Sequence, residues 1–194
     1  ARKWLLLTSV HAFFSGSVHS TLDKIIRKLR KKNEAGMSDL WDITRKSLPR
    51  VSADLFDTVK KSKGIGLAAP QIGILKRAFV IDTTLFSKDQ ENIAPICEQI
   101  FINPEILEQR ASKIYYEEGC LSIPEIFEEV QRPEKITVRY LDAEFKQIEE
   151  ELDGIQARIF QHEFDHLNGI LFIDRLNPLK RKLLARNLNK IVNS

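Results

Sequence analysis

A pair of histidines inside one predicted helix constrains this chain more than any other feature. Residues 154–168 have apolar positions spaced as on one helix face, and Gly169 follows as a helix-ending residue. Within this segment His162 and His166 are four residues apart, so both imidazoles leave the same face and can reach one ion. Glu163 stands beside them and can hold a water at that ion. The pattern therefore predicts a metal-binding helix.

The same spacing also arises by chance in helices whose histidines simply face solvent. Two observations favour the metal: the chain has only 4 histidines, and Ile155, Ile159 and Phe160 predict that this helix is buried. Buried polar side chains need partners, and a metal ion would satisfy both imidazoles.

A catalytic site of this kind needs a third protein ligand, and the downstream sequence does not supply one. In one protease pattern a glycine and then a histidine follow; Gly169 is in place, but Phe172 stands where the histidine should be. The other protease solution uses a later glutamate, and none follows Glu163. Both standard protease patterns fail here.

The third ligand must then lie upstream, and Cys120 is the best candidate. Gly119 before it allows close backbone approach, and a thiolate binds borderline-soft ions well. The alternative is that Cys120 is a small buried apolar residue. Cys97 is a weaker rival, since residues 89–98 look like an exposed insertion. Two histidines and one cysteine leave one position open for water, which indicates a catalytic site rather than a structural one.

The remaining chain predicts a mixture of helices and strands. Helices are expected at 20–33 and 52–61 and after Pro178, and strands at 77–82, 99–102, 113–116, 135–140 and 143–151. This order indicates the α+β class, with a helix packed against antiparallel sheet. The length of 194 residues suits one domain, or one domain with an appendage. No apolar run reaches the roughly 20 residues that cross a membrane, so we expect no membrane contact.

Charge is distributed unevenly along the chain. The net charge is +3, but residues 1–50 carry +7 and residues 175–194 carry +6, so the middle is acidic. Basic ends can bring the protein to an anionic partner such as RNA; the alternative is solvated lysines and arginines on helix faces. Two cysteines cannot build a disulfide framework, which favours a reducing compartment.

Three motifs resemble those of the peptide deformylase family, in the family's order: Gly64–Gln71 (GIGLAAPQ), Glu118–Ser122 (EGCLS) and Gln161–His166 (QHEFDH). One motif alone would be a weak signal, whereas three in order make coincidence improbable. The resemblance covers roughly residues 51–185. It predicts a deformylase catalytic domain at 51–194 with a basic C-terminal helix. Residues 1–50 form an N-terminal segment that matches the family poorly.

The resemblance implies antiparallel β-sheets packed around a central helix that carries the HExxH motif. It implies a hydrolase that removes the N-formyl group from formylmethionine of nascent polypeptides and releases formate. Glu163 would take a proton from water and pass it to the departing nitrogen. Gln71 and the backbone N–H of Leu121 would stabilise the oxyanion. The implied metal ligands are Cys120, His162 and His166.

The resemblance also implies a substrate site. Ile65, Gly66 and Gly119 would offer backbone to the peptide like an added strand; without the family, Gly64-Ile-Gly66 would be only a helix stop. An apolar pocket for methionine is assigned to Ile155 and Ile159, which could equally be plain core.

Three further polar residues have predicted roles. Arg158 stands where the best-known members carry an apolar residue, which predicts an altered pocket entrance; Asp165 is expected to orient a ligand, and Arg132 to pair with Glu118 or elsewhere.

Ligand type alone does not identify the metal, because this set accepts Zn, Fe, Ni or Co. By resemblance we expect one Fe(II) per chain. Expected partners are formylmethionyl nascent peptides and, through the basic helix from Lys180 to Lys190, the ribosome. We expect a monomer in a bacterial-type cytoplasm, with a mitochondrion or plastid as the alternative. The competing functions are an HExxH zinc endopeptidase and a metal-stabilised structural or RNA-binding module without turnover.

Overall fold

The computed structural model describes residues 46–84 and 98–184, and the elements that follow lie within these ranges. Helix α2 (Leu48–Ser62) leads into strand β1 (Gly66–Ala68), the short 3-10 helix η2 (Ala69–Ile72) and strand β2 (Ala78–Ile81). The long strands β3 (Gln99–Cys120) and β4 (Ile123–Leu141) follow, then β5 (Gln147–Asp153), helix α3 (Gly154–Leu167) and η4 (Phe172–Arg175). A last helix begins at Pro178 and is described to residue 184. The helix predicted at 20–33 and the rival ligand Cys97 lie outside the described residues.

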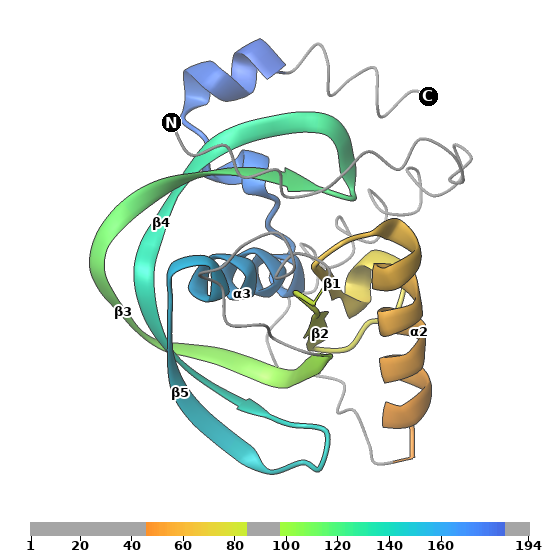
Figure 1. The fold of residues 1–194 in the computed structure, drawn as a ribbon. Coiled ribbons are helices and arrows are strands. Elements are labelled where there is room, and N and C mark those ends of the chain that lie inside the picture. The colour runs from red at the N-terminus through yellow and green to blue at the C-terminus, as the bar shows by residue number, and fades with distance from the viewer. Residues whose placement is uncertain (1–45, 85–97, 185–194) are drawn as a thin grey trace, which may run out of the picture.

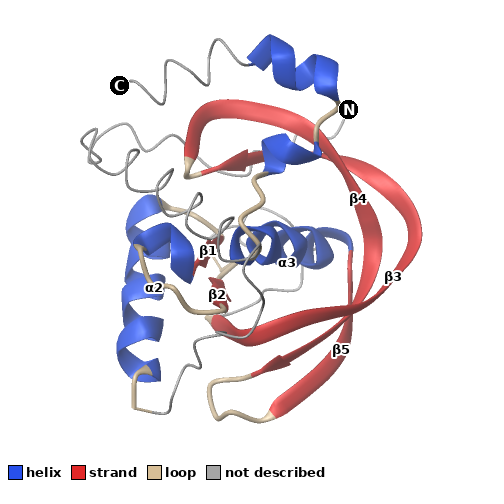
Figure 2. Ribbon diagram, turned by 180° about the vertical axis from the view of Figure 1, so that it is seen from behind, coloured by secondary structure: helices blue, strands red, loops and turns tan. Residues whose placement is uncertain are grey.

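The five strands form one antiparallel sheet in the order β1-β2-β3-β4-β5. Strands β3 and β4 pair along most of their length and curve around α3, as Figure 1 shows. The view from behind in Figure 2 shows α2 lying beside the short strands β1 and β2. The expected α+β architecture, with antiparallel strands around the helix that carries the histidines, is confirmed.

Strands β3 and β4 are longer than the sequence predicts, whereas β2 and β5 are shorter than the predicted 77–82 and 143–151. Residues 99–102 and 113–116, expected as separate strands, belong to the single 22-residue strand β3. Pro104 and Pro133 predict breaks in these strands, because proline lacks the N–H that a strand ladder uses. In the structure the β3–β4 register shifts just after Ile102, next to Pro104, and again before the pair Lys113–Pro133. Such bulges bend the strands and accommodate the prolines, which lets β3 and β4 wrap around α3.

Alternate residues of β2 pack on opposite faces of the sheet, as the two-residue period of a strand requires. Phe79 faces α3, where its ring stacks on Phe101 with centroids 4.9 Å apart and meets Phe160 edge-on at 5.1 Å. Val80 faces the other way and packs in the core cluster of α2, together with Leu55. The sheet is therefore buried on both faces in this region, and α3 is an interior helix.

Helix boundaries follow the capping signals. Helix α3 ends at Leu167, and Gly169 takes the left-handed conformation with φ 70°, as its place after the helix predicts. Helix α2 begins at Leu48, earlier than the predicted residue 52, because Pro49 suits a first helical turn and Leu48 and Val51 are buried. Within the described ranges, the helices are all too short or too polar to span a membrane.

Candidate metal and catalytic site

Three side chains from distant parts of the sequence converge where the end of β3 meets α3. Cys120 at the end of β3 and His162 and His166 on α3 each offer one ligand atom, and these atoms lie within 4.8 Å of one another. The thiol sulfur of Cys120 is 3.3 Å from Nε2 of His166. The structure thus brings together the ligand set that the sequence predicts.

Local structure explains how Cys120 reaches the helix. The β3–β4 register shifts between Glu118 and Cys120, and Cys120 then pairs with Ile123 across a tight turn. The backbone N–H of Ser122 donates to the thiol sulfur at 3.4 Å, which fixes its direction. Phe172, at the position where a protease would carry its third histidine, is buried and its ring stacks near that of His162 with centroids 6.3 Å apart.

The electrostatics of this cluster suit a cation. Burial alone would raise the pKa of the Cys120 thiol, but His166 and His162 outweigh it and hold that pKa well below its usual range. Burial likewise opposes charge on His162, yet the hydrogen bonds with Cys120 and Glu118 raise its pKa well above the ordinary value. A thiolate beside two imidazoles in a site that stabilises positive charge fits a divalent metal ion.

Glu118 orients one of the histidines. Its Oε2 lies 2.9 Å from Nδ1 of His162, and its two oxygens accept hydrogen bonds from Arg132 (2.7 and 2.9 Å) and from Nη1 of Arg158 (2.8 Å). Burial raises the pKa of Glu118, but the bonds from Arg132 and His162 outweigh it and keep that pKa well below normal. An ionised carboxylate only accepts, so Nδ1 carries the hydrogen and Nε2 is left for a metal.

This buried charge cluster was only partly expected. Of the two options for Arg132, the pair with Glu118 is present, and both side chains are nearly fully buried. Asp165, which was expected to orient a metal ligand, contacts Arg132 instead, with its Oδ2 2.6 Å from Nη1 of Arg132. It also pairs with Arg175. Removing any one partner would leave an uncompensated buried charge, so the cluster holds Glu118 in place.

Glu163 lies against strand β1, in contact with Gly66. A Cβ on Gly66 would come within 2.7 Å of its Oε1, so glycine is what allows this approach. Its Oε2 is buried and has no hydrogen-bond partner among the described residues. Burial raises the pKa of this carboxyl above the ordinary value, against the opposing effect of His162 and His166. A buried, unpartnered carboxylate oxygen beside a ligand cluster is what a water or substrate would satisfy.

Gln71 and Leu121 flank the cysteine. The Oε1 of Gln71 accepts the backbone N–H of Ala68 at 2.8 Å, so its amide nitrogen must point toward the site. That nitrogen lies 3.1 Å from Oγ of Ser122 and 3.8 Å from the sulfur of Cys120. Leu121 follows the cysteine directly, and its half-buried side chain packs into the α2 cluster.

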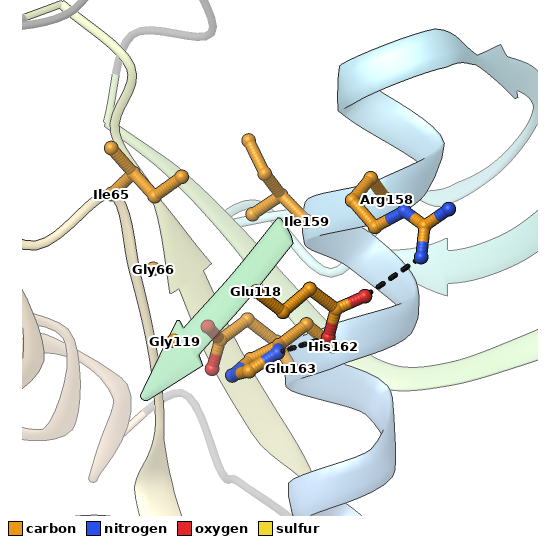
Figure 3. A pocket seen from close by; sticks show the side chains of 8 residues that line it. All are labelled: Ile65, Gly66, Glu118, Gly119, Arg158, Ile159, His162 and Glu163. Atoms are coloured by element: carbon orange, nitrogen blue, oxygen red, sulfur yellow. Dashed lines mark hydrogen bonds and ion pairs between the residues drawn. The ribbon is translucent and has the colours of Figure 1, made fainter. Parts of the chain in front are cut away.

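A pocket opens next to Glu163, between β1, the end of β3 and α3 (Figure 3). Its volume is about 30 Å³, and it is partly open to solvent. Four of the five predicted substrate residues line it: Ile65, Gly66, Gly119 and Ile159. Ile155 is absent from its lining and packs half-buried against the core around α3, so its contact with substrate stays a prediction.

The contacts that Arg158, Ser122 and Arg175 make in the site were not predicted from the sequence. Arg158 was expected to alter the pocket entrance; the structure shows it lining the pocket and bonded to Glu118. A signal for this was available, because Arg158 precedes His162 by four residues and so shares its helix face. The contacts of Ser122 and Arg175 depend on chain folding and had no comparable local signal.

Comparison with known proteins gives one family. The sequence profile described as polypeptide deformylase matches residues 23–182, a range that begins within the N-terminal segment 1–50, whose motifs resemble the family poorly. A peptide deformylase from Cytophaga hutchinsonii is 42% identical over 169 residues, covering 87% of this chain and 86% of that protein. One from Thermotoga neapolitana is 46% identical over 148 residues, covering 76% and 84%.

Solved structures give the same result. A Plasmodium falciparum peptide deformylase in complex with an inhibitor is 39% identical, with a TM-score of 0.67 over 79% of this chain and 90% of that one. An Arabidopsis thaliana peptide deformylase in complex with an inhibitor is 30% identical, with a TM-score of 0.70 over 87% and 86%. Sequence, fold and the cysteine–histidine cluster agree, and the chain belongs to the polypeptide deformylase family.

Proposed function

We propose that this chain is the metal-dependent hydrolase that removes the N-formyl group from formylmethionine of nascent polypeptides and releases formate. The observation that carries the proposal is the Glu163 carboxylate, buried beside the Cys120, His162 and His166 cluster with Oε2 unpartnered among the described residues. A structural metal site has no need of a buried base next to its ligands.

The metal ligands in this proposal are Cys120, His162 and His166, with one ion per chain. A divalent ion there would supply a Lewis acid that polarises the formyl carbonyl and lowers the pKa of water. We retain Fe(II) as the metal in the cell, with Zn, Ni or Co able to bind the same donors. Glu118, held by Arg132 and Arg158, keeps His162 in the orientation that binding requires.

Glu163 does the proton chemistry. Its buried Oε2 has no hydrogen-bond partner among the described residues, so it can accept a proton from the attacking water and return it to the leaving nitrogen. The raised pKa of Glu163 favours this exchange, because a carboxyl whose pKa is closer to neutral pH can both accept and return a proton. The amide nitrogen of Gln71 and the backbone N–H of Leu121 donate to the formyl oxygen as negative charge develops on it.

Substrate binding uses the edge next to the pocket. The backbone at Ile65, Gly66 and Gly119 can pair with an extended peptide, because the glycines carry no side chain to obstruct it. The pocket wall at Ile159 then takes the apolar side chain of the first residue. Ile155 remains our assignment for a more distant part of this wall.

The remaining proposals concern the rest of the chain. We propose a division into an N-terminal segment at 1–50 and a catalytic domain at 51–194, and a monomeric protein of the bacterial cytoplasm, as suits its bacterial relatives. We also propose that the basic segment from Lys180 to Lys190, which is described as helix as far as residue 184, contacts ribosomal RNA. In its described part Lys180 pairs with Glu128 and Arg181 with Asp174, so RNA would have to compete for these two cations.

The test is formate release from a formyl-Met-Ala-Ser peptide by protein loaded anaerobically with Fe(II). We expect turnover by the wild type and, for Glu163→Gln, a loss of about 10²–10⁴-fold in kcat with the metal retained. The surface change Glu149→Gln, on an exposed pair with Arg139, is the matched control and should leave kcat unchanged. Cleavage of internal peptide bonds without formate release would support the endopeptidase. Metal retention without turnover of either substrate would support a structural role.

A further inference from the structure

Arg158 helps to hold Glu118, but the proposed function gives no role to its position in the pocket lining. It lies on α3 one turn before His162, and only 2% of its surface is exposed. A guanidinium stays charged at any physiological pH, so its burial has to be compensated by hydrogen bonds or opposite charge. An apolar side chain could line the same pocket without the free-energy cost of burying a charge, so a specific role for the arginine is expected.

The strands that wrap around α3 hold the guanidinium in place. Nη1 donates to Oε1 of Glu118 at 2.8 Å and to the backbone carbonyl of Val130 at 2.9 Å, and Nη2 donates to the carbonyl of Ile114 at 2.8 Å. The guanidinium carbon also lies 5.1 Å from the centroid of the Tyr116 ring. Partners on β3 and β4 therefore fix the charged end, while the helix fixes the backbone end.

An arginine held at both ends has a stem that cannot rotate away. Figure 3 shows the carbon stem of Arg158 next to Ile159, with the guanidinium directed away from Ile65 and Gly66 on the other side of the pocket. The guanidinium is thus bonded to its partners outside the space for substrate, and the methylene groups of the stem form part of the apolar wall of the pocket. A side chain without such an anchor would sample several rotamers and give a softer wall.

We propose that Arg158 is a specificity-determining residue, whose anchored stem sets the size of the side chain that the pocket admits at the formylated residue. The inference deepens the proposed function and rests on it. A wall at a fixed position should favour an unbranched side chain of the length of methionine over one that is a methylene longer. Loss of the stem should relax this preference.

The experiment measures a ratio inside each protein sample: kcat/KM for formyl-Met-Ala-Ser divided by kcat/KM for the ethionine peptide, which is one methylene longer. Arg158→Ala removes the wall, and we expect this ratio to fall about tenfold, the lower range for a methylene in an apolar pocket. Arg158→Lys keeps a charge and part of the stem but lacks the forked anchor, so a smaller fall, about threefold, is expected. A partly unfolded sample lowers both rates equally and leaves the ratio intact.

Arg132→Met is the matched control. It removes the other guanidinium from Glu118 but affects a residue that is absent from the pocket lining. We expect it to lower kcat for both peptides with the ratio unchanged within twofold. The inference is overturned if the ratio stays at the wild-type value in the Arg158 variants, or if Arg132→Met shifts it as much. If Arg158→Ala does not fold, the lysine variant decides. Absence of wild-type turnover on formyl-Met would instead refute the proposed function.

Discussion

The contact between Gly66 and Glu163 allows a sharp test of the site geometry. A Cβ on Gly66 would lie 2.7 Å from Oε1 of Glu163 and 3.0 Å from its Cδ and Cγ. Glu163 is only 5% exposed, so its carboxylate has little room to withdraw. Gly64 is a matched control, because a Cβ there would meet Cδ1 of Leu121 at 3.4 Å, an ordinary contact. Neither glycine has a positive φ, so the backbone accepts alanine at both positions.

The magnitude follows from the displacement. To move from 2.7 Å to an ordinary contact of 3.4 Å, Oε1 must shift by about 0.7 Å. A misplacement of about 1 Å can cost on the order of 10²-fold in rate, so we expect kcat of Gly66→Ala to fall about 30- to 100-fold. This corresponds to roughly 2–3 kcal/mol in the activation barrier. Gly64→Ala should stay within about threefold of the wild type, since its Cβ displaces no group that we assign to the reaction.

The assay is formate release, with kcat separated from KM because Gly66 also lines the pocket. Gly64→Ala should raise stability by about 0.4–1 kcal/mol, whereas overpacking against Glu163 should lower that of Gly66→Ala by about 1–3 kcal/mol, which urea unfolding would check. In a Glu163→Ala background, adding Gly66→Ala should lower the residual kcat less than about twofold, because the displaced group is already gone. The reasoning is refuted if Gly66→Ala keeps wild-type kcat, or if it costs as much when Glu163 is absent.

Three further changes probe the rest of the site and the core. Cys120→Ser should weaken metal retention more than about 100-fold, beyond the loss typical of a neighbouring hydrogen-bond partner, as metal analysis after dialysis against chelator would show. Arg132→Met should lower metal affinity about 10–100-fold, because Glu118 loses its forked partner and holds His162 less well; an unchanged affinity in chelator competition would contradict this. Phe160→Ala should destabilise the fold by about 3–5 kcal/mol in urea unfolding, because this fully buried ring contacts three others; a loss below about 1 kcal/mol would argue against the packing described.

Much of the ligand set was accessible from the sequence because its determinants are local. The helical period alone places His162 and His166 on one face, and Gly169 marks the helix end. The absence of a later histidine or glutamate directs the search upstream, to Cys120. Family resemblance then supplies the activity. These inferences depend on spacing and residue type, which folding does not change.

Long-range geometry was not accessible in the same way. The sequence predicts short strands interrupted by prolines, whereas β3 and β4 continue through bulges that need a partner strand to form. Whether Arg132 would meet Glu118 or solvent depends on the pairing of β3 with β4, which brings together two residues 14 apart in the chain, and the structure decides for Glu118. Tertiary context thus overrides the local turn signals of the prolines.

Spacing and residue type along the chain are enough to predict the helix with its two histidines, the candidate cysteine and hence the chemistry available to the site. How these groups are held depends on the fold: Glu163 lies against Gly66, His162 bonds to Glu118, and Arg158 is anchored to β3 and β4. Helix-face geometry repeats every few residues along the chain, whereas contacts across 40 or more residues depend on strand register and curvature.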